Sequence, residues 1–151
     1  MNKLLFIIII AIVLSGCYES DYSNYNFKVV YIYDGDTVKL SNGEKVRYIG
    51  IDTPEMNYNN PPAEYFAQEA KEYNAKLVLG KKVKLEFDVV KRDKYGRLLA
   101  YVYIDGKHIS QEMIERGFAK VLMIPPNLKF ADYFLTLQNL AKEEKRGIWA
   151  K

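Results

Sequence analysis

Two acidic residues interrupt a β-rich stretch near the start of the chain, "YIYDGDTVKL" at residues 31–40. Asp34 and Gly35 are typical of a hairpin turn, which gives Asp34 a structural explanation. Asp36 has no such explanation, because it lies where a second strand should begin. A carboxylate held at the end of a strand is a hard oxygen ligand, of the kind that Ca²⁺ or Mg²⁺ binds.

Two further clusters of charged residues follow, "VRYIGIDTPE" at 46–55 and "KRDKYGR" at 91–97. The first places Arg47, Asp52 and Glu55 around the end of a strand, where a proline stiffens the exit. Taken alone, the first cluster could be only a strand exit followed by a turn. The second, taken alone, could be only the solvated tip of a hairpin.

Taken together, the clusters contain a set of groups suited to phosphodiester hydrolysis. Asp36 and Asp52 are hard ligands for a divalent cation. Arg47 and Arg97 suit a phosphate that gains negative charge in its transition state. Glu55 is a group that could handle a water nucleophile.

The elements that must position these groups are short strands, followed and interrupted by helices. β-Rich runs predict about five strands, at 27–33, 37–40, 44–51, 81–91 and 97–109, the last a hairpin with Asp105 and Gly106 in its turn. Apolar residues at helical spacing predict three helices, one from Pro61 and Pro62 to Gly80, one capped by Ser110 and ending at Gly117, and one from Phe130 to near Gly147. This order predicts an α+β, mainly β fold: a five-stranded OB-fold barrel with about three helices packed on it.

The composition is that of one folded domain, and it excludes several kinds of site. The chain has 151 residues and a formal net charge of +3, which is compatible with a polyanionic partner. Because there is one Cys and one His, no internal disulfide or Cys/His zinc cluster can be built. The single His, His108, lies just past a turn and is expected to be an ordinary surface residue, whereas Trp149 is expected to be a packing anchor.

The N-terminus resembles the signal peptide of bacterial lipoproteins. Lys3 precedes an apolar run that is short for a membrane-spanning helix, and Leu14-Ser15-Gly16-Cys17 then resembles the lipobox of that family. The resemblance implies a signal peptide at 1–16, a lipidated Cys17 with a flexible tether at 17–26, and a nuclease-like domain at 27–151 outside the cytoplasm, in the bacterial cell envelope. The alternative is an ordinary secretory signal with an incidental Cys.

From about Phe27 to Trp149 the chain resembles the thermonuclease family of staphylococcal-nuclease-like domains. The motifs that carry the resemblance are "DGDTVKL", "VRYIGIDTPE", "DKYGRLLAYVYIDGK", "ERGFAKV" and "AKEEKRGIW", in that order. The resemblance implies an OB-fold enzyme that cleaves DNA and RNA with Ca²⁺, with single strands preferred, and leaves 5′-hydroxyl and 3′-phosphate ends. The protein is expected to be a monomer.

The resemblance also assigns roles to individual residues, matched motif by motif. It implies Ca²⁺ ligands at Asp36, Asp52 and the Thr53 carbonyl, with Asp34 in the second shell of the metal. Glu55 would orient or deprotonate the attacking water. Arg47 and Arg97 would bind the scissile phosphate, and Lys94 and Tyr95 would contact the terminal phosphate of the nucleotide.

One stretch departs from the family pattern. After "GFAKV" the family has tyrosines that pack beside the bound base, but this chain has "LMIPPN" at 122–127, in which Met123 offers an apolar surface instead. Base preference is therefore open.

A catalytically inactive nucleic-acid-binding module is the alternative function, and an envelope adhesion protein is a third. Related domains that only bind have lost the acids, whereas this chain has both arginines, both metal acids and Glu55, and an adhesion protein would leave this set unexplained.

Overall fold

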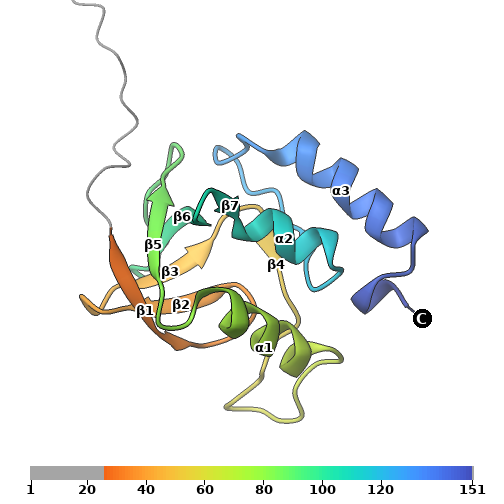
Figure 1. Cartoon of the computed structure of the whole chain (residues 1–151), viewed down its shortest axis with the longest axis horizontal. Coiled ribbons are helices and arrows are strands. Elements are labelled where there is room, and N and C mark those ends of the chain that lie inside the picture. The colour runs from red at the N-terminus through yellow and green to blue at the C-terminus, as the bar shows by residue number, and fades with distance from the viewer. Residues whose placement is uncertain (1–25, 151) are drawn as a thin grey trace, which may run out of the picture.

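Five strands close into a barrel in the computed structural model, which describes residues 26–150 (Figure 1). The barrel strands are β1 (Phe27–Ile32), β2 (Thr37–Leu40), β3 (Lys45–Tyr48), β5 (Lys82–Glu86) and β6 (Leu98–Ile104). They are hydrogen-bonded in the order β3-β2-β1-β5-β6, and a parallel pairing of β3 with β6 closes the ring. This confirms the predicted OB-type barrel. The predicted signal peptide, Cys17 and nearly all of the tether lie outside the described residues.

Short strands and helices complete the domain. The short strands are β4 (Ile51–Asp52), which pairs with β8 (Lys120–Val121), and β7 (Lys107–His108), which pairs antiparallel with the end of β6. The helices are α1 (Ala67–Val78), α2 (Ile109–Glu115), α3 (Ala131–Glu143) and a 3₁₀ turn at Gly147–Trp149. In Figure 1, α1 lies below the barrel, and α2 and α3 lie together on its right. Within residues 26–150, no helix has the length and apolar character needed to cross a membrane.

The core fills the barrel with alternate residues of each strand. Val38 on β2, Val46 on β3 and Leu85 on β5 are fully buried, while their neighbours along each strand mostly face outward or are only partly buried. A register shift between Val29 and Tyr31 marks a β-bulge in β1. The bulge bends β1 so that its first residues pair with β5 and its later residues pair with β2.

Several predicted boundaries were wrong, each for a local reason. The first helix begins at Ala67 rather than at the prolines, because Phe66 has a left-handed φ of 71° that turns the chain just before the helix. The strand predicted at 81–91 ends at Glu86, and Val89 is therefore 68% exposed instead of facing the core. The run at 44–51 splits into β3 and β4 at Gly50, whose φ is +83°.

The expectation for His108 was also wrong. Its ring is buried, and it lies 4.7 to 5.5 Å from the ring centroids of Tyr101, Tyr103, Phe130 and Phe134. Its side chain also caps α2 by accepting the backbone N–H of Gln111 at 3.4 Å, so that Ser110 is not the cap. The Ser110 hydroxyl instead donates to the carbonyl of Ile49.

The buried imidazole predicts a loss of stability in acid. Burial lowers the pKa of His108 from 6.5 to about 4, so the unfolded chain binds more protons than the folded chain between these values. The free energy of unfolding should therefore fall by about 2 kcal/mol more between pH 7 and pH 5 than it would without this group. His108→Asn keeps a capping acceptor but cannot titrate, and it should remove this part of the slope.

Urea titrations of the wild type and of His108→Asn at both pH values measure the difference between the two slopes. Loss of ring packing lowers the stability of the variant at both pH values, so only the slope is informative. Equal slopes would show that His108 does not stay neutral in the folded protein.

Candidate active site

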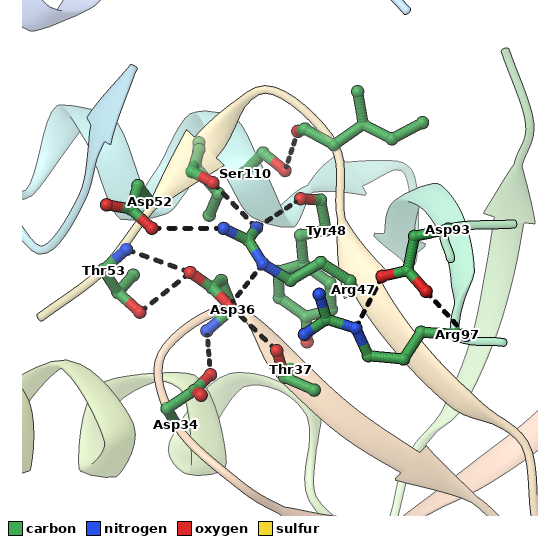
Figure 2. Close-up of polar contacts among 12 residues, drawn as sticks. Asp34, Asp36, Thr37, Arg47, Tyr48, Asp52, Thr53, Asp93, Arg97 and Ser110 are labelled. Atoms are coloured by element: carbon green, nitrogen blue, oxygen red, sulfur yellow. Dashed lines mark hydrogen bonds and ion pairs between the residues drawn. The ribbon is translucent and has the colours of Figure 1, made fainter. Parts of the chain in front are cut away.

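Asp36 lies immediately before β2 and is almost completely buried, with 1% of its surface exposed. One carboxylate oxygen accepts the Thr37 hydroxyl at 2.9 Å and Nε of Arg47 at 3.0 Å. The other accepts the backbone N–H of Thr53 at 2.9 Å and its hydroxyl at 3.1 Å (Figure 2). These four donors fill the acceptor sites of an ionised carboxylate, which stabilises the charge in a buried position.

The turn that carries Asp36 is held from two directions. Gly35 passes so close to Thr53 that a Cβ at this position would lie 2.7 Å from the threonine methyl group, which explains the glycine between the two acids. On the other side, the buried Asn74 of α1 donates to the carbonyl of Asp34 at 3.1 Å. The Asp34 carboxylate in turn accepts the N–H of Asp36 at 3.0 Å.

Arg47 joins the acids to the backbone of β3 and β4. Besides binding Asp36, it donates from Nη1 to the carbonyls of Tyr48 and Ile51, both at 2.7 Å, and from Nη2 to Asp52 at 3.2 Å. A guanidinium has five N–H donors, so these contacts leave only one hydrogen on Nη2 free to meet a ligand. The arginine is as much a structural link as a potential ligand contact.

Burial and the charge of Asp36 raise the pKa of three acids around it at this end of the barrel. Burial raises the pKa of Asp34 to about 7, and the charge of Asp36 adds to the rise. The pKa of Asp52 is raised by burial and then by Asp36, although Arg47 opposes the shift. Burial, Asp36 and Asp52 likewise raise the pKa of Glu55, which is exposed. Such mutual repulsion favours the binding of a cation.

Arg97 comes from the turn before β6 and is oriented by Asp93. Its Nε donates to the Asp93 carboxylate at 2.7 Å, and the same carboxylate accepts the backbone N–H groups of Tyr95 and Arg97. Burial raises the pKa of Asp93, but the hydrogen bonds from Arg97 outweigh it and leave the pKa below its usual value. No hydrogen bond from the Nη atoms of Arg97 is found within residues 26–150.

A cavity of about 330 Å³ brings the two arginines together. Arg47, Arg97, Lys94 and Tyr95 all line it. Apolar residues line it as well, among them Leu122, Ile124, Pro125 and Pro126. They belong to the stretch 122–127, in which aromatic residues of the family pattern are replaced. Met123, which was expected to offer the apolar surface, is not part of the cavity lining. The cavity lining is therefore partly cationic and partly apolar.

The structure thus brings together most of the residues singled out in the sequence. Asp36 and Asp52 bind Arg47, and Thr53 binds Asp36. Arg97, Lys94 and Tyr95 line one cavity with Arg47, whereas Asp36, Asp52, Thr53 and Glu55 are not part of its lining. Thr37, which binds Asp36, and Asp93, which binds Arg97, are not among the site residues predicted from the sequence. The position of Asp93 four residues before Arg97, in a Gly-containing turn, is the only sequence signal for its role.

A five-stranded OB barrel with an acidic cluster and two arginines beside a cavity defines a domain suited to phosphate chemistry. The sequence model of the family described as "Staphylococcal nuclease homologue" matches residues 45–151. The chain belongs to this family.

Relatives of known name agree with this assignment. Endonuclease YncB and the SPbeta prophage-derived endonuclease YokF, both of Bacillus subtilis (strain 168), are each 44% identical over 123 residues, or 78% of this chain. The thermonuclease of Staphylococcus hyicus is 32% identical over 134 residues, which cover 87% of this chain and 79% of that protein. The chain spans 58% of the length of YncB and 42% of that of YokF.

The different surroundings of the two arginines predict different effects on stability. Arg47→Met should lower the free energy of unfolding by about 3–5 kcal/mol, because the buried charge of Asp36 loses its ion-pair partner. Arg97→Met should lower it by no more than about 1 kcal/mol, because the Arg97–Asp93 pair is partly solvated. Urea unfolding of both variants gives the comparison. Equal losses would contradict the structural role assigned to Arg47.

Proposed function

We propose that the protein is a Ca²⁺-dependent nuclease that hydrolyses phosphodiester bonds of DNA and RNA. The observation that carries this proposal is the placement of Arg47 and Arg97 on one cavity, next to the buried Asp36 and the half-exposed Asp52. Membership of the nuclease family and the names of its relatives support the same reaction. We also propose that 5′-hydroxyl and 3′-phosphate ends result, and that Cys17 tethers the enzyme to the outside of the membrane as a monomer.

The donor set fits a hard divalent cation. Asp52 and the Thr53 carbonyl would hold Ca²⁺ together with Asp36, whose carboxylate would give up one of its four hydrogen bonds to the ion. The raised pKa values of Asp34, Asp52 and Glu55 indicate surplus negative charge at this position. Within residues 26–150, no three His, Cys, Asp or Glu side chains converge on a ready metal site. Because Ca²⁺ takes six to eight oxygens, water and substrate oxygens would complete its shell. When bound, the ion supplies positive charge beside the scissile phosphate.

The protein's own residues divide the remaining work. Arg97, whose Nη atoms have no hydrogen-bond partner in the described chain, offers both of them to phosphate oxygens. Arg47 offers its one remaining hydrogen, and a second contact would require release of Asp52. Glu55 orients or deprotonates water, a role that its raised pKa favours. Lys94 and Tyr95 contact a terminal phosphate from the rim of the cavity.

Removal of the metal should abolish cleavage and lower stability. Activity on single-stranded DNA should vanish in chelator and return with Ca²⁺, and Mg²⁺ should restore less because it requires a tighter octahedron. Ca²⁺ should raise the melting temperature of the wild type. Asp52→Asn should weaken this binding by at least about tenfold, since it removes a charged ligand. Glu143→Gln removes an exposed acid from α3 and serves as the control. Full activity in chelator would exclude this mechanism.

Arginine variants should separate transition-state stabilisation from ground-state binding. Arg97→Lys keeps the charge but loses the planar fork, and kcat should fall by about 10²–10³. Arg47→Lys should lose as much, together with stability. Lys94→Ala should mainly raise KM and reduce the salt dependence, because a ground-state phosphate contact acts through counterion release. If Arg97→Lys retains the wild-type kcat, Arg97 is only a charged residue at a turn.

A further inference from the structure

Beyond Arg47, the outer face of β1, β2 and β3 carries aromatic and basic side chains that the candidate active site does not use. Tyr31 on β1 pairs with Lys39 on β2, and Lys39 pairs with Lys45 on β3. Residues directly paired on antiparallel strands point to the same face of a sheet. These three side chains therefore form one row across the outer face of the three strands.

The β-bulge in β1 turns Tyr31 outward. Val29 and Ile32 are both buried, and the extra residue between them leaves Val30 and Tyr31 facing solvent. Tyr31 is 48% exposed, and its ring lies 4.9 Å from that of Tyr33 in an edge-to-face arrangement. A second exposed tyrosine, Tyr58, donates its hydroxyl to the carbonyl of the partly buried Tyr33 at 2.7 Å. We call Tyr31, Tyr33, Tyr58, Lys39, Lys45 and Lys71 the tyrosine–lysine face.

Lysines lie among these rings. The Lys45 ammonium lies 4.7 Å from the Tyr33 ring centroid, and the Lys71 ammonium lies 5.9 Å from that of Tyr31 and 5.1 Å from that of Tyr58. Glu44, which precedes Lys45, is already held by Arg92 through hydrogen bonds of 2.7 and 2.9 Å. The face therefore combines exposed ring surface with positive charge, as surfaces that bind single-stranded nucleic acid do.

The tyrosine–lysine face is continuous with the candidate active site. Lys45 and Arg47 are two residues apart on β3, so they point to the same side of the strand, about 7 Å apart along it. Tyr33 directly precedes Asp34, the first acid of the turn. A polynucleotide held at Arg47 therefore needs to extend by only about 7 Å along β3 to reach Lys45.

We propose that the tyrosine–lysine face binds single-stranded polynucleotide, as a continuation of the strand whose phosphodiester lies at Arg47 and Arg97. The inference rests on the proposed nuclease function and extends it to a longer substrate. A base stacks on the ring of Tyr31, and Lys39, Lys45 and Lys71 contact phosphates. Such contacts carry no base preference. They favour single strands, because the bases of a duplex are already stacked on one another.

Fluorescence anisotropy of the full chain in chelator tests the proposal without turnover. The probe is a labelled single strand of about 12 nucleotides, within the range that one OB fold covers. Tyr31→Ala should weaken binding about tenfold, and Tyr31→Phe should stay within about twofold of the wild type, because stacking needs only the ring. Lys45→Gln should reduce the slope of log Kd against log salt by about 0.7, the value for one phosphate contact with a single strand. The effects should shrink as the strand is shortened.

Matched controls lie on α3, away from this face. Tyr133 is also 48% exposed, and Lys142 lies 4.7 Å from the ring of Trp149, as Lys45 does from that of Tyr33. Tyr133→Ala and Lys142→Gln should bind the strand like the wild type. Circular dichroism and melting temperatures confirm that each variant is folded.

The outcomes separate this inference from the proposed function. Failure of the wild type to bind the strand, or wild-type binding by both Tyr31→Ala and Lys45→Gln, would overturn the inference even if the enzyme cleaves DNA in Ca²⁺. Binding that depends on Tyr31, in a protein that cleaves no nucleic acid, would contradict the nuclease proposal and leave the inference standing.

Discussion

A carboxylate with 1% of its surface exposed must be paired if it is to stay ionised, and the structure around Asp36 is organised to meet this requirement. Arg47 supplies the opposite charge, and Thr37 and Thr53 supply the remaining donors. Through the same guanidinium, the pair links the turn before β2 to the backbone of β3 and β4. Because one network holds both the barrel end and the acids, stability and the geometry of the site cannot be varied independently at these positions.

The same network is incompletely neutralised. Arg47 is shared between two acids, while Asp34 and Glu55 add charge nearby, and the pKa values of Asp34, Asp52 and Glu55 all lie above their usual range. Clustering like charges costs stability, and proteins tolerate that cost mainly where a ligand or a reaction uses it. Arg97, in contrast, has a single acidic partner. Asp93 binds only one edge of Arg97 and leaves its outer nitrogens available, which prepares that group for a ligand.

The barrel strands and the principal acid of the site could be predicted from the sequence, because their residue types either fit or break the pattern of a β-strand. Asp36 stands out as an acid where a strand should begin, and alternating apolar residues predict the barrel strands. What the sequence does not reveal depends on contacts between distant segments. The burial of His108 follows from aromatic rings contributed by β6 and α3, and the outward turn of Tyr31 follows from a bulge that no pattern announces. The number of Arg47 donors left for a ligand likewise depends on where β4 places its carbonyl. The roles of the site residues and the lipid anchor stay predictions.

The barrel closes where β3 runs parallel to β6, and this seam has a consequence for the order in which the molecule is assembled. Arg47 is paired with Leu99 across it, so the two arginines approach each other only when segments some fifty positions apart in the chain have met. Parallel pairing between distant segments is a slow step in folding, because the entropy of closing a long loop must be overcome first. A chain that has formed its first three strands but not this seam has Asp36 and Arg47 without the cavity that Arg97 completes. The cavity lined by both arginines is therefore completed late, as a property of the closed barrel and not of any shorter intermediate.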